Sequence, residues 1–137
     1  MSEAFLFPSD KWVKEFCRKL NENKTYEEAA KNWEGDFLFI ITPDGSLDRE
    51  YIFYVDLWHG KCRKAELVGS REEKKTAYIF EGPYSNWKRL IRGELDPIMA
   101  IMTKKFKLQG DMSKVVRAVK AAKELVLTAS KVPTQFK

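Results

Sequence analysis

The segment Glu50-Tyr-Ile-Phe-Tyr-Val-Asp-Leu-Trp58 decides the fold class, because large apolar side chains occupy both sets of its alternating positions. Successive side chains of a β-strand point to opposite faces of the sheet. One face therefore carries Tyr51, Phe53, Val55 and Leu57, and the other carries Ile52, Tyr54, Asp56 and Trp58. Residues 36–42 are also apolar at both sets of positions, so both faces of the predicted sheet require cover.

Further strands and helices follow on either side of this segment. Strands at 36–42, 50–58, 63–68 and 76–81 are joined by short loops, which predicts an antiparallel meander. Residues 105–109 alternate and predict a fifth strand. Apolar stripes predict helices at 10–23, from Thr25, and at 83–91, 98–103 and 112–127, with Leu125 on the outer side of the last one. We expect a single α+β domain over residues 1–137, with a five-stranded mainly antiparallel sheet covered by helices.

The composition narrows the class of protein. The chain has 137 residues, of which 44% are hydrophobic and 33% charged. Its longest apolar runs hold five residues, whereas a membrane-spanning helix needs about 20. Because neither a secretory signal nor a peroxisomal C-terminal tripeptide is visible, we expect a cytoplasmic protein.

The positive charge is concentrated near the C-terminus. The formal net charge is +5, and residues 104–123 hold seven basic residues against Asp111 alone. A local basic surface indicates an anionic partner, such as phospholipid headgroups, a phosphorylated ligand or nucleic acid. The alternative is a solvated helix face that keeps the protein soluble.

Residues with catalytic or metal-binding chemistry are few. The two cysteines, Cys17 and Cys62, exclude a disulfide scaffold and a four-thiolate metal site. Cys17 lies on the apolar face of the first helix, so we expect a buried, unreactive thiol. His59 precedes Gly60 and is expected in a turn, while Asp56 is either a buried acid or a residue at a solvated edge. We expect no catalytic residue, no metal ion and no cofactor.

The segment from Trp87 to Met102 is unusually rich in Ile, Leu and Met. Methionine adapts to irregular apolar surroundings, and Met99 and Met102 suit an interior that must accept varied apolar shapes. A helix layer over an apolar sheet can enclose a ligand cavity. The alternative is an ordinary, well-packed core.

The C-terminal half resembles the sterol carrier protein type 2 family. The resemblance rests on Trp87-Lys-Arg-Leu-Ile-Arg-Gly93, on Leu95-Asp-Pro97 before a short apolar helix, and on Lys107-Leu-Gln-Gly-Asp111 before a final helix. It covers residues 76–127 well, and the order of the earlier elements is compatible with it. One departure is Thr103-Lys104-Lys105, where the family has a glycine-containing link. The resemblance, without a peroxisomal address, suggests a stand-alone prokaryotic-type member.

This resemblance implies an apolar tunnel that binds a fatty acid, fatty acyl-coenzyme A, sterol or isoprenoid-like lipid, without a catalytic step. The tunnel residues it implies are Phe53, Val55, Trp87, Leu90, Ile91, Ile98, Met102, Phe106, Val115 and Val119. Lys104, Lys105, Lys120 and Lys123 would contact an anionic headgroup, a coenzyme A phosphate or, transiently, an anionic membrane surface.

Two other functions fit the sequence. The basic region could bind nucleic acid, although the aromatic residues cluster in apolar stripes and not among the lysines. The chain could also be an accessory or dimerisation module that binds an enzyme partner.

Overall fold

A computed structural model describes residues 4–137 of the chain. Seven strands and six helices follow one another in the order β1 (Phe5–Phe7), α1 (Asp10–Glu22), α2 (Lys24–Ala29), β2 (Glu34–Thr42), β3 (Tyr51–Trp58), β4 (Lys61–Val68), the 3₁₀ turn η1 (Arg71–Glu73), β5 (Tyr78–Pro83), α3 (Tyr84–Ile91), α4 (Pro97–Met102), β6 (Lys107–Gln109), α5 (Met112–Arg117), α6 (Val119–Lys131) and β7 (Thr134–Phe136). The predicted α+β class is confirmed.

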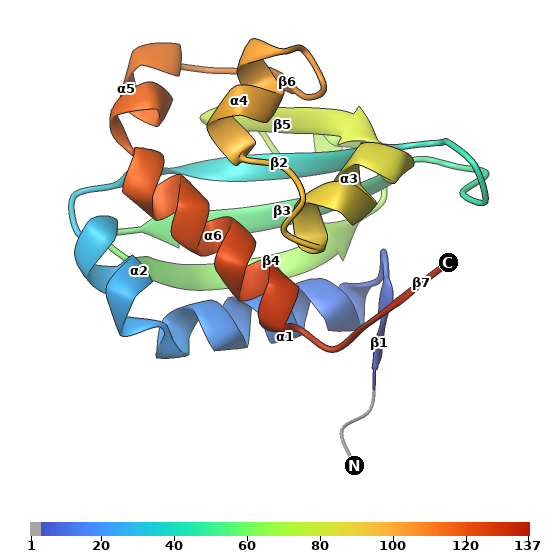
Figure 1. Cartoon of the computed structure of the whole chain (residues 1–137), viewed down its shortest axis with the longest axis horizontal. Helices are drawn as coiled ribbons and strands as arrows, with labels where there is room; N and C mark the ends of the chain where they lie inside the picture. Colours follow the sequence, from blue (N-terminus) through green and yellow to red (C-terminus); the bar gives the residue numbers. More distant parts are fainter. Residues whose placement is uncertain (1–3) are drawn as a thin grey trace.

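The main sheet has five strands in the order β4-β3-β2-β5-β6. Strand β2 pairs antiparallel with β3 and parallel with β5, so the sheet is mixed, with three antiparallel pairings of four. Figure 1 shows α3, α4 and α6 in front of this sheet, with α1 along its β4 edge. The predicted four-strand meander is therefore wrong at its last step, since β5 pairs with β2 and not with β4.

The connection from β4 to β5 explains this topology. The outer face of the sheet buries Leu38, Ile40 and Ile52. The 69–77 connection lies against this face, where Arg71 binds Glu50 at 2.6 Å and Glu81 at 3.0 Å. The crossing chain segment thus covers apolar side chains that a simple hairpin would leave exposed, and it delivers β5 to the far side of β2.

The C-terminal region differs from its prediction in two ways. The helix predicted over 112–127 is two helices, α5 and α6, separated at Ala118. The tail contains β7, which pairs in parallel with β1. Neither three-residue strand carries enough alternation to be recognised in the sequence.

The link between α4 and β6 keeps the geometry that a glycine provides. Lys104 has a φ of 63°, in the left-handed region. Its N–H donates to Ile101 O, and the N–H of Lys105 donates to Ala100 O. This pair of bonds is the Schellman termination of a helix, whose left-handed residue is usually glycine. Lys104 occupies that position here.

Candidate functional site

An apolar space lies between the inner face of the sheet and the helices. It is a cavity of about 100 Å³, and every side chain that lines it is apolar. The lining residues are Trp12, Phe16, Phe37, Phe39, Phe53, Phe80, Trp87, Leu90, Ile91, Pro97, Ile98, Ile101, Leu108, Val115, Ala122, Leu125, Val126 and Ala129.

The sheet side of the cavity is aromatic, and its rings pack against Trp87 of α3 and Phe106 of the loop before β6. Phe39 lies 5.7 Å and Phe80 lies 5.5 Å from Trp87, measured between ring centroids. Phe80 also stacks on Phe106 at 4.5 Å. Such aromatic contacts add stability beyond the buried area, so this wall is stiff.

Both tryptophans turn their polar atoms away from the cavity. The indole N–H of Trp12 donates to Thr134 Oγ1 at 2.9 Å, and that of Trp87 donates to Ile40 O at 3.0 Å. Since these donors are already satisfied, the cavity presents only hydrocarbon and aromatic surface. It is suited to a hydrocarbon ligand and offers a water molecule no hydrogen-bond partner.

Two neighbouring spaces adjoin the cavity. A smaller one of about 40 Å³ shares Phe37, Val115, Ala122 and Leu125 with it, and is otherwise lined by Tyr26, Trp33, Leu57, Ala118 and Ala121. Burial raises the pKa of the Tyr26 hydroxyl. An open groove of about 300 Å³ between the α3–α4 loop and α6 shares Pro97 and Val126 with the cavity.

Six of the ten expected tunnel residues line the cavity, namely Phe53, Trp87, Leu90, Ile91, Ile98 and Val115. The other four do not. Val55 and Phe106 are buried in the surrounding core, Val119 is half-buried, and Met102 is 63% exposed.

The break at Ala118 accounts for one of these differences. A continuous helix would keep Val115 and Val119 on one stripe, since residues four apart share a face. Because the chain leaves the helical path at Ala118, the stripe of α6 shifts, and Leu125, expected on the outer side, lines the cavity together with Ala122.

Of the four lysines expected to bind an anion, Lys123 lines the open groove, together with Glu94 and Asp96. Lys104, Lys105 and Lys120 line none of the three spaces. Lys123 is therefore the basic side chain among the residues that line the groove.

Asp56 and His59 lie apart from the cavity. Asp56 is on the outer face of β3 and binds Arg63 at 3.1 Å. His59 lies in the turn between β3 and β4, with its ring nitrogens bonded to Lys31 O and Glu34. Both positions are accounted for by surface hydrogen bonding.

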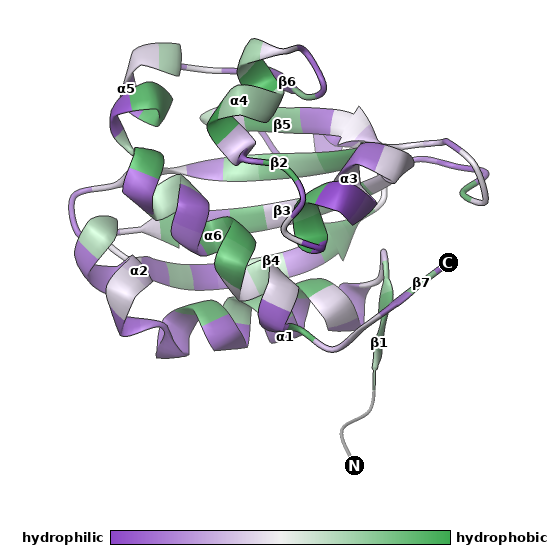
Figure 2. Ribbon diagram, in the orientation of Figure 1, coloured by the Kyte–Doolittle hydropathy of each residue, from purple (hydrophilic) through white to green (hydrophobic). Residues whose placement is uncertain are grey.

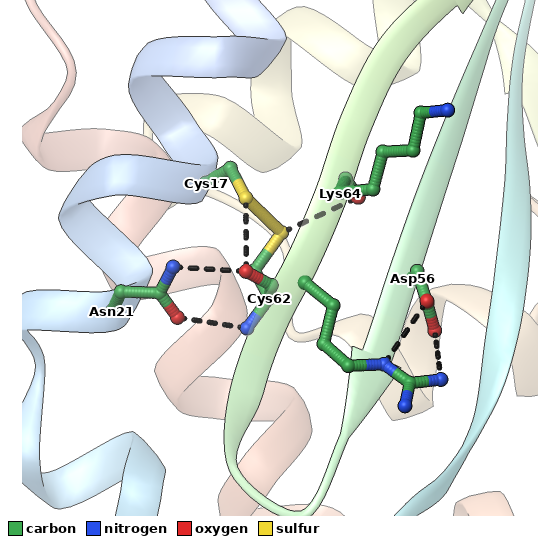
Figure 3. The surroundings of a disulfide bond; sticks show 6 residues. Cys17, Asn21, Asp56, Cys62 and Lys64 are labelled. Carbon is green, nitrogen blue, oxygen red and sulfur yellow. Dashed lines mark hydrogen bonds and ion pairs between the residues drawn. A yellow bond between two sulfur atoms is a disulfide. The ribbon is translucent and has the colours of Figure 1, made fainter.

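The two cysteines form a disulfide, so the expected free thiol at Cys17 is wrong (Figure 3). The bond joins α1 to β4 with a Cα–Cα distance of 5.5 Å. Beside it, Asn21 accepts from Cys62 N at 2.8 Å and donates to Cys62 O at 2.9 Å. Covalent and hydrogen bonds thus fix the helix that supplies Trp12 and Phe16 to the cavity.

Several lining residues were not expected from the sequence. Trp12 and Phe16 lie on the apolar stripe of the first helix, and Phe37 and Phe39 alternate on one face of the first long strand. These patterns predict burial, but they do not distinguish a side chain facing a cavity from one packed in a core.

No cluster of three or more His, Cys, Asp or Glu side chains among residues 4–137 could hold a metal ion. No helix in the same range is both long and apolar enough to cross a bilayer.

A five-stranded sheet with an all-apolar cavity between its inner face and the helix layer defines a small α+β domain. Residues 13–123 match the SCP-2 sterol transfer family. The chain belongs to this family, and the resemblance found in its sequence is confirmed.

Solved structures agree with this assignment. A crystal structure of sterol carrier protein 2 is 31% identical, with a TM-score of 0.81 over 90% of this chain and 97% of that one. A conserved hypothetical protein from Thermus thermophilus, described as possibly a sterol carrier protein, is 31% identical. Its TM-score is 0.85, and the match covers 98% of this chain and 94% of that one. Sterol carrier protein 2 from Yarrowia lipolytica shares the fold at 16% identity. Its TM-score is 0.58, and the match covers 86% of this chain and 88% of that one. A comparison with curated protein sequences gave no significant match.

Proposed function

We propose that this protein is a non-catalytic carrier that holds the hydrocarbon part of a fatty acid, fatty acyl-coenzyme A, sterol or isoprenoid-like lipid in the apolar cavity. Family membership supports lipid binding and transfer in general terms. The observation that carries the proposal is the cavity itself, about 100 Å³ of space without a polar lining residue. Each buried methylene group contributes about 0.8 kcal/mol, so ten such groups would offset the entropic cost of association.

A long acyl chain requires more room than the cavity offers. An engineered apolar cavity of about 150 Å³ accepts benzene, whereas this cavity measures about 100 Å³. We propose that the ligand enters through the groove beside Lys123, passes Pro97 and Val126, and extends toward the smaller space by displacing Leu125 and Val115. In that arrangement Lys123 pairs with the acidic end of the lipid, while its methylene groups cover apolar surface.

The ligand class can be identified directly. Protein purified without detergent is extracted with organic solvent, and the extract is analysed by mass spectrometry. Titration with a fluorescent fatty acid and with an acyl-coenzyme A then measures affinity. A protein that is always empty and binds neither probe would refute the proposal and favour the accessory or dimerisation role, which native mass spectrometry over a range of concentrations would reveal.

A cavity-filling variant tests the location of the site. Ala122 lines both the cavity and the smaller space beside it, so Ala122→Phe places a ring where the ligand is proposed to lie. We expect at least a tenfold loss of fatty acid affinity, with unfolding stability unchanged or raised because a void is filled. Lys131→Phe at the exposed end of the same helix is the matched control. If Ala122→Phe destabilises the fold and leaves lipid affinity intact, ligand binding occurs elsewhere.

A cytoplasmic location stays a prediction. Disulfides persist mainly in oxidising compartments and, among cytosolic proteins, in those of hyperthermophiles. Counting free thiols after acid quenching of native cells would show whether the Cys17–Cys62 bond exists where the protein works.

A further inference from the structure

Helices α4 and α5 carry apolar side chains on their outer surface as well as toward the cavity. Ile98, Ile101 and Val115 line the cavity. On the outside, Met99 is 57% exposed, Met102 63% and Val116 42%. Figure 2 shows α4 as a largely hydrophobic piece of ribbon, joined to more hydrophilic segments in the loop that follows it and in α5. A set of exposed large apolar side chains of this kind marks an interaction surface.

The basic residues around these side chains form no ion pair with an acidic residue in the part of the chain that the structure describes. None of the seven basic residues between 104 and 123 forms an ion pair within the described chain, although Lys and Arg residues elsewhere form many. Lys107 pairs in register with Glu81 on the outer sheet face, opposite the cavity. The other six accompany the exposed apolar residues on the helix layer and its loops.

The N-terminal helix contrasts with this surface. On α1, Lys14 binds Asp10, and Arg18 binds both Glu15 and Glu22. The charges of its exposed face are thus largely neutralised within the helix. An external anion gains more from the cations beside α4 and α5, because none of them is held in an ion pair among residues 4–137.

We propose that this surface, hereafter the basic apolar face, docks the protein onto an anionic phospholipid bilayer. It comprises Met99, Met102, Lys104, Lys105, Lys114, Val116, Arg117, Lys120 and Lys123. The methionines and Val116 enter the interfacial region, and the basic side chains contact lipid phosphates. A bilayer fits better than nucleic acid because exposed Met and Val gain nothing from a phosphate backbone. The inference rests on the proposed function. Ile98 and Ile101, on the opposite side of α4, line the proposed ligand cavity, so docking through α4 would place this wall of the cavity at the bilayer that supplies the lipid.

Vesicle flotation of the full chain tests the proposal. We expect binding to phosphatidylcholine vesicles that contain phosphatidylglycerol, little binding to phosphatidylcholine alone, and a decline with rising salt. Each basic side chain near an anionic surface contributes roughly a fivefold gain in binding, so Lys114→Gln/Lys120→Gln is expected to weaken it about 25-fold. Lys11→Gln/Lys75→Gln removes the same charge from exposed, unpaired lysines elsewhere and is expected to change binding less than about threefold.

The apolar contribution is tested separately by Met99→Gln/Met102→Gln, which keeps side-chain length and helix propensity. We expect at least a fivefold loss of vesicle binding. The proposal is overturned if the two lysine pairs weaken binding equally, if the methionine variant binds like the wild type, or if duplex DNA is bound more tightly than anionic vesicles at the same salt concentration.

Fatty acid titration without vesicles separates this proposal from the proposed function. Vesicle binding without fatty acid affinity would refute only the carrier function. Fatty acid affinity without vesicle binding would refute only the docking surface.

Discussion

The bond between Cys17 and Cys62 is expected to supply a large share of the stability of the fold. The two residues are 45 positions apart, and the bridge joins α1 to β4. A cross-link restricts the unfolded chain more strongly as the enclosed loop lengthens, and for this separation the entropy lost by the unfolded state corresponds to about 4 kcal/mol. Domains of this size are typically stable by only about 5–15 kcal/mol.

Urea denaturation with and without a reductant measures this contribution. For a slope of about 2 kcal/mol per molar urea, the midpoint is expected to fall by roughly 2 M on reduction. The hydrogen bonds between Asn21 and the backbone of Cys62 remain in the reduced protein and keep α1 against β4. The reduced protein is therefore expected to fold, with a lower midpoint.

The double variant Cys17→Ser/Cys62→Ser is the control, since the reductant should not alter its midpoint. A loss of less than about 1 kcal/mol on reduction of the wild type would show that the bridge restricts the unfolded chain far less than this reasoning requires. Two titratable thiols in air-oxidised protein would contradict the pairing itself.

Two further substitutions test the packing beside the cavity. A Cβ atom at Gly82 would lie 2.6 Å from a ring carbon of Phe106. Gly82→Ala is therefore expected to displace that ring and to lower the free energy of unfolding, measured by urea denaturation, by about 1–3 kcal/mol. The control Gly69→Ala should cost less, because its Cβ would lie 3.5 Å from the nearest atom. Lys104→Gly removes the steric cost of a left-handed backbone conformation at that position. It is expected to leave the free energy of unfolding unchanged or to raise it by up to about 1 kcal/mol. The control Lys105→Gly removes the same charge and should lower the free energy of unfolding by about 0.5–1 kcal/mol. A clear loss for Lys104→Gly would contradict the Schellman assignment.

The elements that could be predicted from the sequence are those with a long periodic pattern. The stripe of Trp12, Val13, Phe16 and Leu20 identifies α1, and the double-sided apolar pattern identifies β2 and β3. The pairing of the strands was harder to predict, because alternation shows that a segment is a strand without showing which strand lies beside it. The placement of β5 next to β2 depends on the crossing 69–77 connection and its Arg71 ion pairs.

The break between α5 and α6 illustrates a second limit. It occurs at Ala118, and alanine is the best helix former, so no local signal marks it. The disulfide was equally hidden, since bridging requires Cα atoms within about 7 Å, and that distance is set by the packing of α1 on β4. Both features change which side chains reach the cavity or how firmly they are held there.

The cavity lowers the stability of the fold, which supports the proposed role in ligand binding. An unfilled space of about 100 Å³ costs about 2.4 kcal/mol at roughly 24 cal/mol per Å³. Small residues, Ala122 and Ala129, lie on its helix side, where longer aliphatic side chains would fill it. On the opposite side, Phe39 and Phe80 of the sheet contact the ring of Trp87 on α3, and these rings cannot move inward without losing those contacts. An aromatic wall thus faces small and aliphatic residues across this space, and a hydrocarbon chain bound there would gain dispersion contacts with both sides.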